Sequence, residues 1–108
     1  MAAYVIANVK VTDDSWLPKY AEKVHDIIHR HGGMYLSRSA NVETLEGEPL
    51  DTALVAIVQF PSVEAAKDFA ADPEYVPLAK SRQAGSVTQA FVIDDTDAAG
   101  TVPYLLNG

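Results

Sequence analysis

The sequence predicts an α+β domain in which a four-stranded antiparallel sheet carries its helices on one face. Three observations predict it. Four stretches are rich in β-branched residues or alternate with a period of two, two longer ones repeat apolar residues at helical spacing, and their order is strand, helix, strand, strand, helix, strand. This order is that of the ferredoxin-like βαββαβ sandwich. A chain of 108 residues fits one domain, 1–108, with a core at about 2–94 and a C-terminal extension at 95–108.

The first strand and the first helix are predicted by contrasting apolar patterns. Residues 3–11 have one wholly apolar face, while the opposite face, which carries Tyr4, is mixed and is typical of a face that meets a pocket or a partner. A helix is expected to begin near Ser15, in a turn that supplies capping side chains, and to reach His31. The Gly32-Gly33 pair then offers a left-handed residue that ends a helix without a steric clash.

A hairpin is expected to follow this helix. Residues 34–40 alternate as a second strand, residues 41–52 form an acidic connection, and residues 53–60 form the most apolar strand, expected to be central and covered on both faces. In the second strand, strict alternation places Tyr35, Ser37 and Ser39 on one side and Leu36 and Arg38 on the other.

The second half of the chain predicts a broken helix and a last strand. Ser62 caps a helix through about Ala71, and Asp72-Pro73 restarts it, because proline is favoured at the first helical position. Gly85 ends the helix, and residues 87–93 form the fourth strand. An apolar cluster at 102–106 follows an acidic turn.

Composition argues against several classes of partner and cofactor. Eight basic and fifteen acidic residues give a net charge of -7, so we expect neither a nucleic acid nor a membrane surface as a partner. The absence of cysteine excludes disulfides and thiolate-bound metals and suits a cytoplasmic protein. The N-terminus has neither the charge pattern of a signal peptide nor a membrane span, and no phosphate or dinucleotide fingerprint occurs, so no cofactor is expected.

The uncovered face of the sheet predicts a homodimer. Two helices cover one side only, and several strands carry apolar and aromatic residues on the other side. Because a soluble monomer seldom exposes an apolar patch of several hundred Å², we expect two copies to pack sheet against sheet. The cluster at 102–106 is either a frayed terminus or a segment that lies across the partner.

Several short motifs, in order along the chain, resemble the family of domains of unknown function numbered 1330. The resemblance covers roughly residues 2–94 and implies a dimeric α+β barrel, a superfamily that also includes cofactor-independent monooxygenases, small isomerases, dehalogenating enzymes and stress proteins. Two departures are Ala70-Ala71, where the family often has an aromatic residue, and a longer tail. The motifs are Tyr4-Val5-Ile6, His31-Gly32-Gly33, Arg38, Phe60-Pro61-Ser62, Glu64-Ala65-Ala66, Asp72-Pro73-Glu74-Tyr75 and Arg82.

Six residues are the candidates for a site. His31 and Arg38 are the candidate catalytic residues, since a histidine transfers protons near neutral pH and an arginine holds a carboxylate or enolate. The other four are candidates for substrate binding, suited to a small acidic or aromatic metabolite. They are Tyr4, Tyr20, Tyr75 and Arg82.

Each candidate also has a purely structural interpretation. His31 suits a helix end or a core position, the tyrosines suit core edges, and the arginines suit surface pairs, Arg38 with Glu43 or Glu46 and Arg82 with Glu74 or Glu64. His25 and His29 stand four apart on the helix, but no third ligand follows from the sequence, so no metal site is expected.

Two functions remain open at this point. One is a cofactor-free enzyme of the isomerase or monooxygenase type that transfers a proton on a bound metabolite. The other is a non-catalytic binding or stress-associated homodimer. The first predicts that His31 is accessible and points toward Arg38 or Tyr20, whereas the second allows His31 to be sealed by backbone partners.

Overall fold

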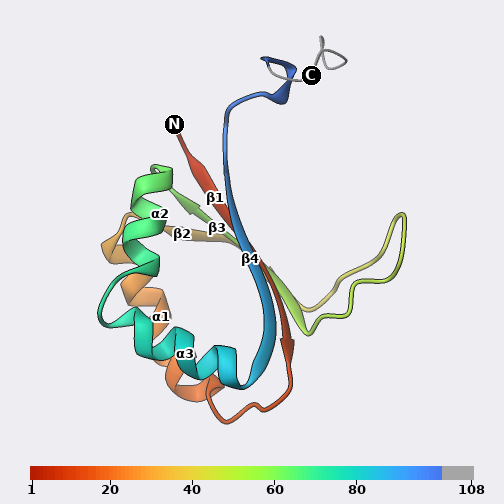
Figure 1. Cartoon of the computed structure of the whole chain (residues 1–108), viewed down its shortest axis with the longest axis vertical. Coiled ribbons are helices and arrows are strands. Elements are labelled where there is room, and N and C mark those ends of the chain that lie inside the picture. The colour runs from red at the N-terminus through yellow and green to blue at the C-terminus, as the bar shows by residue number, and fades with distance from the viewer. Residues whose placement is uncertain (101–108) are drawn as a thin grey trace.

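The computed structural model describes residues 1–100 and confirms the predicted α+β fold. A four-stranded antiparallel sheet in the order β2-β3-β1-β4 carries all three α-helices on one face (Figure 1). The elements are β1 (Ala3–Val11), α1 (Leu17–Arg30), β2 (Met34–Ser39), β3 (Leu54–Phe60), α2 (Val63–Ala70), α3 (Tyr75–Ala84), β4 (Ser86–Asp94) and the short 3₁₀ helix η1 (Ala98–Gly100). The apolar cluster predicted at 102–106 lies outside the described residues.

Helix boundaries agree with the prediction except at two starts. The first residue before α1 is Trp16, whose side chain makes no capping hydrogen bond; the carboxylate of Asp13 instead accepts from the amide of Ser15. The helix expected to restart at Pro73 begins at Tyr75, because residues 72–74 form a turn in which Asp72 accepts the amide of Glu74 at 2.8 Å. Ser62 caps α2 as predicted, with its side-chain oxygen accepting the amide of Ala65.

The register of β2 corrects the predicted alternation of its side chains. Tyr35 lies opposite Val58 and Arg38 lies opposite Ala56, with an irregularity between Tyr35 and Ser37. Val58 and Ala56 are buried on the helix side of the sheet. Tyr35 and Arg38 therefore share the helix-facing side, because one extra residue in a strand reverses the alternation beyond it.

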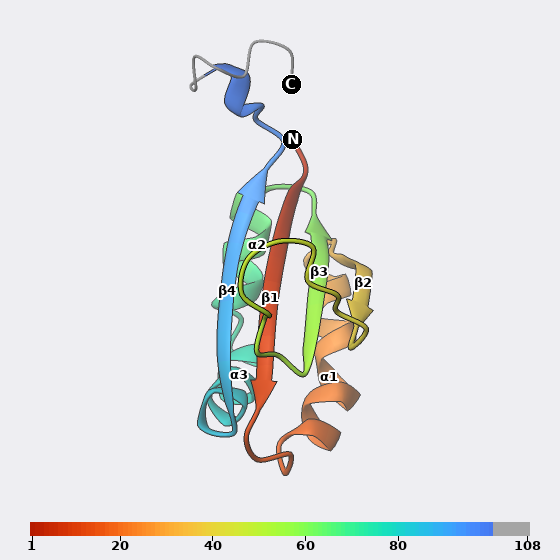
Figure 2. The same ribbon diagram turned by 90° about the vertical axis from the view of Figure 1, so that its right-hand side faces the viewer.

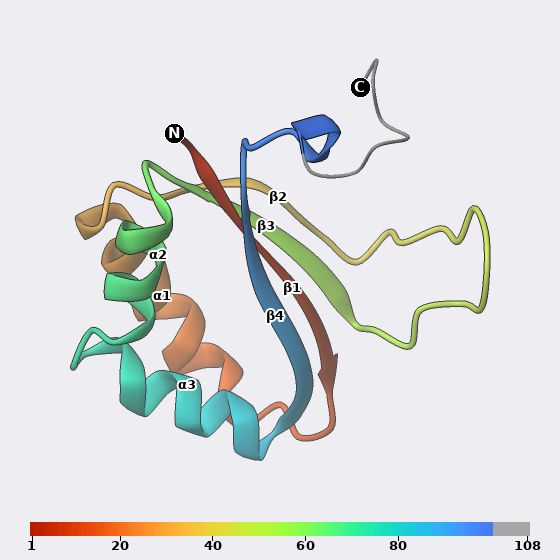
Figure 3. The ribbon, with the colours of Figure 1, turned by 45° about the horizontal axis from the view of Figure 1, so that its top comes forward.

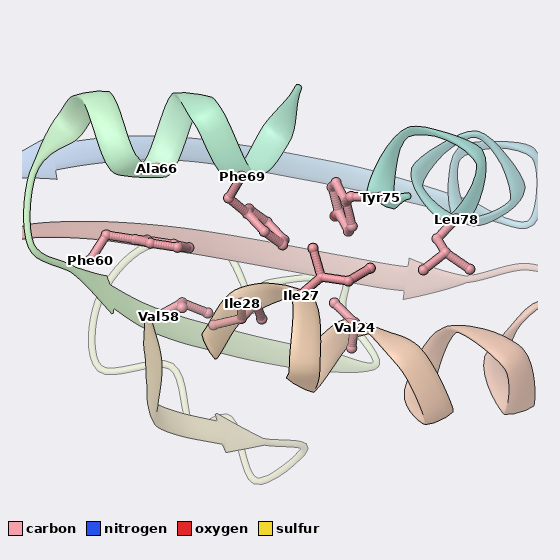
Figure 4. Packing of buried hydrophobic residues seen from close by; sticks show 9 residues of the cluster. All are labelled: Val24, Ile27, Ile28, Val58, Phe60, Ala66, Phe69, Tyr75 and Leu78. Carbon is pink, nitrogen blue, oxygen red and sulfur yellow. The ribbon is translucent and has the colours of Figure 1, made fainter. Parts of the chain in front are cut away.

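The core lies between the helices and one face of the sheet. Apolar residues of α1, α2, α3 and β3 interdigitate there, and the Phe69 ring packs 5.4 Å from Phe60 and 4.2 Å from Tyr75 between centroids (Figure 4). Gly33 lets α1 approach the sheet, since a Cβ there would lie 2.7 Å from both Ile28 and Phe60. The buried members are Val24, Ile27, Ile28, Val58, Phe60, Ala66, Phe69, Tyr75 and Leu78.

The opposite face of the sheet has no helix over it, so among residues 1–100 the central strand β3 is covered by helices on one face and not, as predicted, on both. The acidic connection 41–52 forms an arm that projects from this open face and crosses in front of it (Figures 2 and 3). Leu45, on this arm, is 98% exposed. Large apolar side chains on the open face are also exposed, among them Met34, Val87, Phe91 and Ile93.

Candidate functional site

Three of the six predicted site residues come together between α1 and α3. The phenol oxygens of Tyr20, from α1, and Tyr75, from the start of α3, lie 2.9 Å apart. The guanidinium of Arg82, two turns further along α3, lies 6.0 Å from the centroid of the Tyr20 ring. Positions 75, 78 and 82 fall on one stripe of α3, which is the stripe that packs against α1. We call Tyr20, Tyr75 and Arg82 the tyrosine–arginine cluster.

The tyrosine–arginine cluster has more donors than acceptors. Two phenols carry two protons, and their mutual hydrogen bond uses one, so one O–H remains to donate elsewhere. Arg82 is half-buried and forms no ion pair within residues 1–100; Glu74, the proposed surface partner, pairs with Arg30 instead. A half-buried cation beside a free hydroxyl donor is an environment suited to an anion.

Electrostatics in the cluster act on Tyr20 and Arg82 in the same direction, toward the protonated form. Burial raises the pKa of Tyr20, and the neighbouring Tyr75 raises it further. Burial lowers the pKa of Arg82, but the phenols of Tyr75 and Tyr20 outweigh it and leave that pKa raised. At neutral pH the cluster therefore holds the positive charge of Arg82 and the protonated phenol of Tyr20, which can donate a hydrogen bond.

A cleft of about 350 Å³ opens beside the cluster between the start of α1 and α3. Tyr20 lines it, and Trp16 forms its inner edge, with the indole N–H donating to the carbonyl of Gly85 at 3.1 Å and the ring set edge-on to Tyr20 at 5.2 Å. Trp16 is not among the site residues predicted from the sequence, although a single tryptophan at a helix start is a signal that could have identified it. The remaining lining residues are Ser15, Lys19, Leu78, Ser81 and Ala84.

Arg38 forms a second group with Tyr35 on the helix-facing side of β2. Its guanidinium lies 4.5 Å from the centroid of the Tyr35 ring, and neither Glu43 nor Glu46 pairs with it in the part of the chain that the structure describes. Burial raises the pKa of Tyr35, and Arg38 opposes this shift.

His31 lies at the other end of α1 and is held by an acidic partner. Its Nε2 lies 2.7 Å from Oδ2 of Asp72, with the ring edge-on to Phe69, and the side chain is 22% exposed. The hydrogen bond from His31 and the amide of Glu74 hold the pKa of the Asp72 carboxyl below its usual range. Within residues 1–100, no interaction joins His31 to Arg38 or to Tyr20. No local sequence signal identifies Asp72 as the partner, because 41 residues separate the two.

Tyr4 lies on the open face, away from the cluster. Its neighbours across the sheet are Gln59 and Ile93, and the carboxylate of Asp95 raises the pKa of its phenol. The rings of His25 and His29 lie 4.2 Å apart on α1. No group of three or more metal-ligating side chains occurs among the described residues, and none of the helices there is long and apolar enough to cross a membrane.

The fold and the cluster define a class of protein: a small α+β sandwich with a donor-rich polar cluster beside a cleft between two of its helices. A protein of unknown function from Rhodopseudomonas palustris, RPA0582, is similar in structure, with a TM-score of 0.72, 20% identity and coverage of 89% of this chain and 83% of that one. The cofactor-independent oxygenase SnoaB from Streptomyces nogalater has a TM-score of 0.62 at 14% identity, over 89% of this chain and 94% of its own.

An antibiotic biosynthesis monooxygenase has a TM-score of 0.58 at 14% identity, covering 90% of this chain and 100% of its own. At these identities the likeness establishes the fold alone. Among curated proteins, the comparison finds no match to this sequence. The chain belongs to the family described as domain of unknown function DUF1330, whose model matches residues 2–96, and this confirms the resemblance found in the sequence.

Proposed function

We propose that this chain is a cytoplasmic, small-molecule-binding homodimer whose ligand is a small acidic or aromatic metabolite. The ligand would enter the cleft between α1 and α3 and place its anionic group against the tyrosine–arginine cluster. The observation that carries the proposal is Arg82, half-buried beside two phenols and without an acidic partner in residues 1–100. A half-buried cation is costly to leave uncompensated, and a carboxylate or enolate offsets that cost.

The ligand class follows from the residues that line the cleft and from the neighbouring tyrosine–arginine cluster. Lys19 and Tyr20 line the cleft, and behind Tyr20 the cluster supplies the charge of Arg82 and one free phenol O–H. The rings of Tyr20 and Trp16 offer apolar faces against which a planar ligand can pack. A volume of about 350 Å³ suits a molecule the size of a benzoate or a small keto acid.

Ligand binding is tested by thermal unfolding with benzoate and with benzyl alcohol as the neutral control of the same size. Benzoate at ten to a hundred times its dissociation constant should stabilise the fold by about 1.4 to 2.7 kcal/mol. For a domain of this size that raises Tm by roughly 6 to 12 °C. Benzyl alcohol should shift Tm far less, and Arg82→Gln should abolish the benzoate shift. Equal shifts for both compounds, or an unchanged benzoate shift in Arg82→Gln, would contradict the assignment of Arg82.

The position of His31 bears on whether the bound ligand reacts. SnoaB is a cofactor-independent oxygenase with this fold, and it supports a cofactor-free proton-transfer enzyme of the isomerase or monooxygenase type, in which His31 and Arg38 would be the catalytic groups. However, among residues 1–100 His31 contacts the Asp72 carboxylate and neither Arg38 nor Tyr20, which is not the arrangement expected of the enzyme. The absence of that arrangement, rather than the Asp72 contact, favours the second candidate, a non-catalytic binding or stress-associated homodimer.

Exchange of ligand protons in D₂O separates the two candidates. An enzyme that transfers a proton should exchange a carbon-bound acidic proton of a bound keto acid, and proton NMR detects the loss of that signal. His31→Gln should stop the exchange if His31 is the base. A ligand that stabilises the fold yet keeps its proton over many hours would support the non-catalytic homodimer.

The homodimer is supported by the chemistry of the open face. Ile6, Ile57 and Phe91 lie side by side across three strands there, and Phe91 is 56% exposed. In the middle of this face the side-chain oxygen of Asn8 is buried without a hydrogen-bond partner in residues 1–100. A second copy placed on this face would cover the apolar residues and bring donors to Asn8. Ile57→Asp, which leaves the helix-side core untouched, should halve the mass measured by light scattering.

A further inference from the structure

The acidic arm at residues 41–52 is fixed at its base and free of polar contacts at its tip. At the base, the carboxylate of Asp51 pairs with Lys10 at 2.6 Å, and the hydroxyl of Thr52 donates to the carbonyl of Val9 at 3.1 Å. By contrast, residues 43–50 form no hydrogen bond and no ion pair within residues 1–100. Ordering these residues costs conformational entropy that hydrogen bonds within one chain do not offset.

The tip of the arm combines an apolar side chain with negative charge. Leu45 is 98% exposed, and Glu43 and Glu46 lie close to it in the sequence. Gly47, with φ of +84°, turns the chain directly after them. Such a tip is complementary to an apolar groove that carries a cation, because burial of a leucine is favourable and a carboxylate gains from a nearby ammonium group.

A groove with this chemistry lies between β4 and α2, which sits behind β4 in Figure 2. It has a volume of about 200 Å³, with the small side chains of Ala66 and Ala70 on one wall and Lys67 as its charged residue. Lys67 forms no ion pair in the part of the chain that the structure describes, and its acidic neighbours on α2, Glu64 and Asp68, do not line the groove. The other lining residues are Val5, Ala90, Phe91 and Val92.

The arm is long enough to reach this groove in a second copy of the chain. In its own chain the arm projects from the open face, whereas α2 lies on the other side of the sheet (Figure 1). Residues 41–52 leave the sheet and return, so about six residues in each direction extend up to roughly 20 Å at about 3.3 Å per residue. Two packed sheets lie about 10 Å apart. In the open-face homodimer the tip therefore passes the second sheet and reaches its helices.

We propose that Leu45 of each copy inserts into the β4–α2 groove of the other, with the acidic residues of the arm beside Lys67 of the partner subunit. This contact rests on the proposed homodimer and keeps β4 inside that assembly. A two-fold axis parallel to the strands places β2 of one copy over β4 of the other, because it reverses the sheet order β2-β3-β1-β4, and the arm continues directly from β2. At a net charge of -7 most of the second copy repels an acidic arm, which directs the arm to a cation.

Cross-linking between two different chains tests where the arm lies. Because the chain contains no cysteine, single introduced cysteines are unambiguous probes. A tagged Leu45→Cys protein, refolded together with untagged Lys67→Cys or Ala70→Cys protein, should form a disulfide between the two kinds of chain under mild oxidation in at least one mixture. Leu45→Cys mixed with Lys80→Cys, an exposed position on α3, should remain unlinked. Absence of both groove links in a protein with the mass of two chains overturns the arm contact.

Dissociation of the dimer on dilution, followed by light scattering, gives a second readout. Leu45→Ser should raise the dimer dissociation constant at least about tenfold, because both copies lose their apolar anchor. Lys67→Glu should also raise it, whereas Lys80→Glu, the matched charge reversal outside the groove, should raise it far less. A dimer that Leu45→Ser and Lys67→Glu leave as tight as the wild type overturns the arm contact and leaves the open-face homodimer standing. A wild type that is a single chain at every concentration overturns both.

Discussion

Removal of one phenol oxygen from the tyrosine–arginine cluster is the sharpest test of its geometry. In Tyr75→Phe the ring is retained, so its packing at 4.2 Å against Phe69 is kept. The lost interaction is the 2.9 Å bond to the phenol of Tyr20. A hydrogen bond contributes about 0.5 to 1.5 kcal/mol net, and a buried partner left unpaired costs about 1 to 3 kcal/mol. Since Tyr20 lines the cleft and can bond to water, the lower range applies, about 1 kcal/mol, or roughly 4 °C in Tm.

A double-mutant cycle isolates this bond from other effects of the substitutions. Urea unfolding of the wild type, Tyr20→Phe, Tyr75→Phe and the double variant, at one fixed protein concentration, gives four free energies of unfolding. Each substitution should lower the free energy of unfolding less in the other variant than in the wild type, and the difference, the coupling free energy, should be about 1 kcal/mol. Free energies that add within about 0.3 kcal/mol would show that the two phenols are not bonded and would remove the donor count on which the anion site depends.

Three further changes test other parts of the fold. Gly85→Ala should destabilise the protein by 2 kcal/mol or more, because a Cβ there would lie 2.6 Å from the indole nitrogen of Trp16, and thermal melts would show a clear drop in Tm. The lowered pKa of Asp72 means that its carboxylate contributes stability that is present above its unfolded pKa of about 3.9 and is lost as pH falls through the lower folded value. Asp72→Asn should therefore lower the free energy of unfolding at neutral pH and make it fall less steeply as the pH is lowered. A free energy of unfolding that falls with pH as steeply in the variant as in the wild type would contradict the pairing with His31. Ser62→Ala removes the cap of α2, whose oxygen accepts the Ala65 amide at 3.0 Å, and should cost about 1 kcal/mol in urea unfolding.

Periodicity predicted the fold because both halves of the chain bury regular faces. The alternation in β1 and the stripe in α1 each place a continuous apolar surface on one side, and Gly32, with φ of +77°, ends α1 as predicted. The sides of β2 could not be predicted, because strict alternation assumes an unbroken ladder. One irregular pair after Tyr35 moved Arg38 to the helix side.

The candidate site was only partly predictable for a different reason. Tyr20, Tyr75 and Arg82 come from two helices whose facing stripes were visible in the sequence, so their meeting followed from the fold. The acidic partner of His31 could not be predicted in the same way. His31 and Asp72 are 41 residues apart, and their contact depends on where the turn after α2 places Asp72. The residue types indicated anion binding and proton transfer, but only the tertiary structure shows which of these residues lie close enough to act together.

The position of Trp16 makes it an intrinsic fluorescence probe of the cleft. It is the only tryptophan, is 8% exposed, lines the cleft and touches the ring of Tyr20. Its emission therefore arises from one known location, shielded from water and one ring away from the proposed anion. A guest in the cleft would alter the brightness or colour of that emission, so occupancy can be followed in unlabelled protein, in real time and at micromolar concentration.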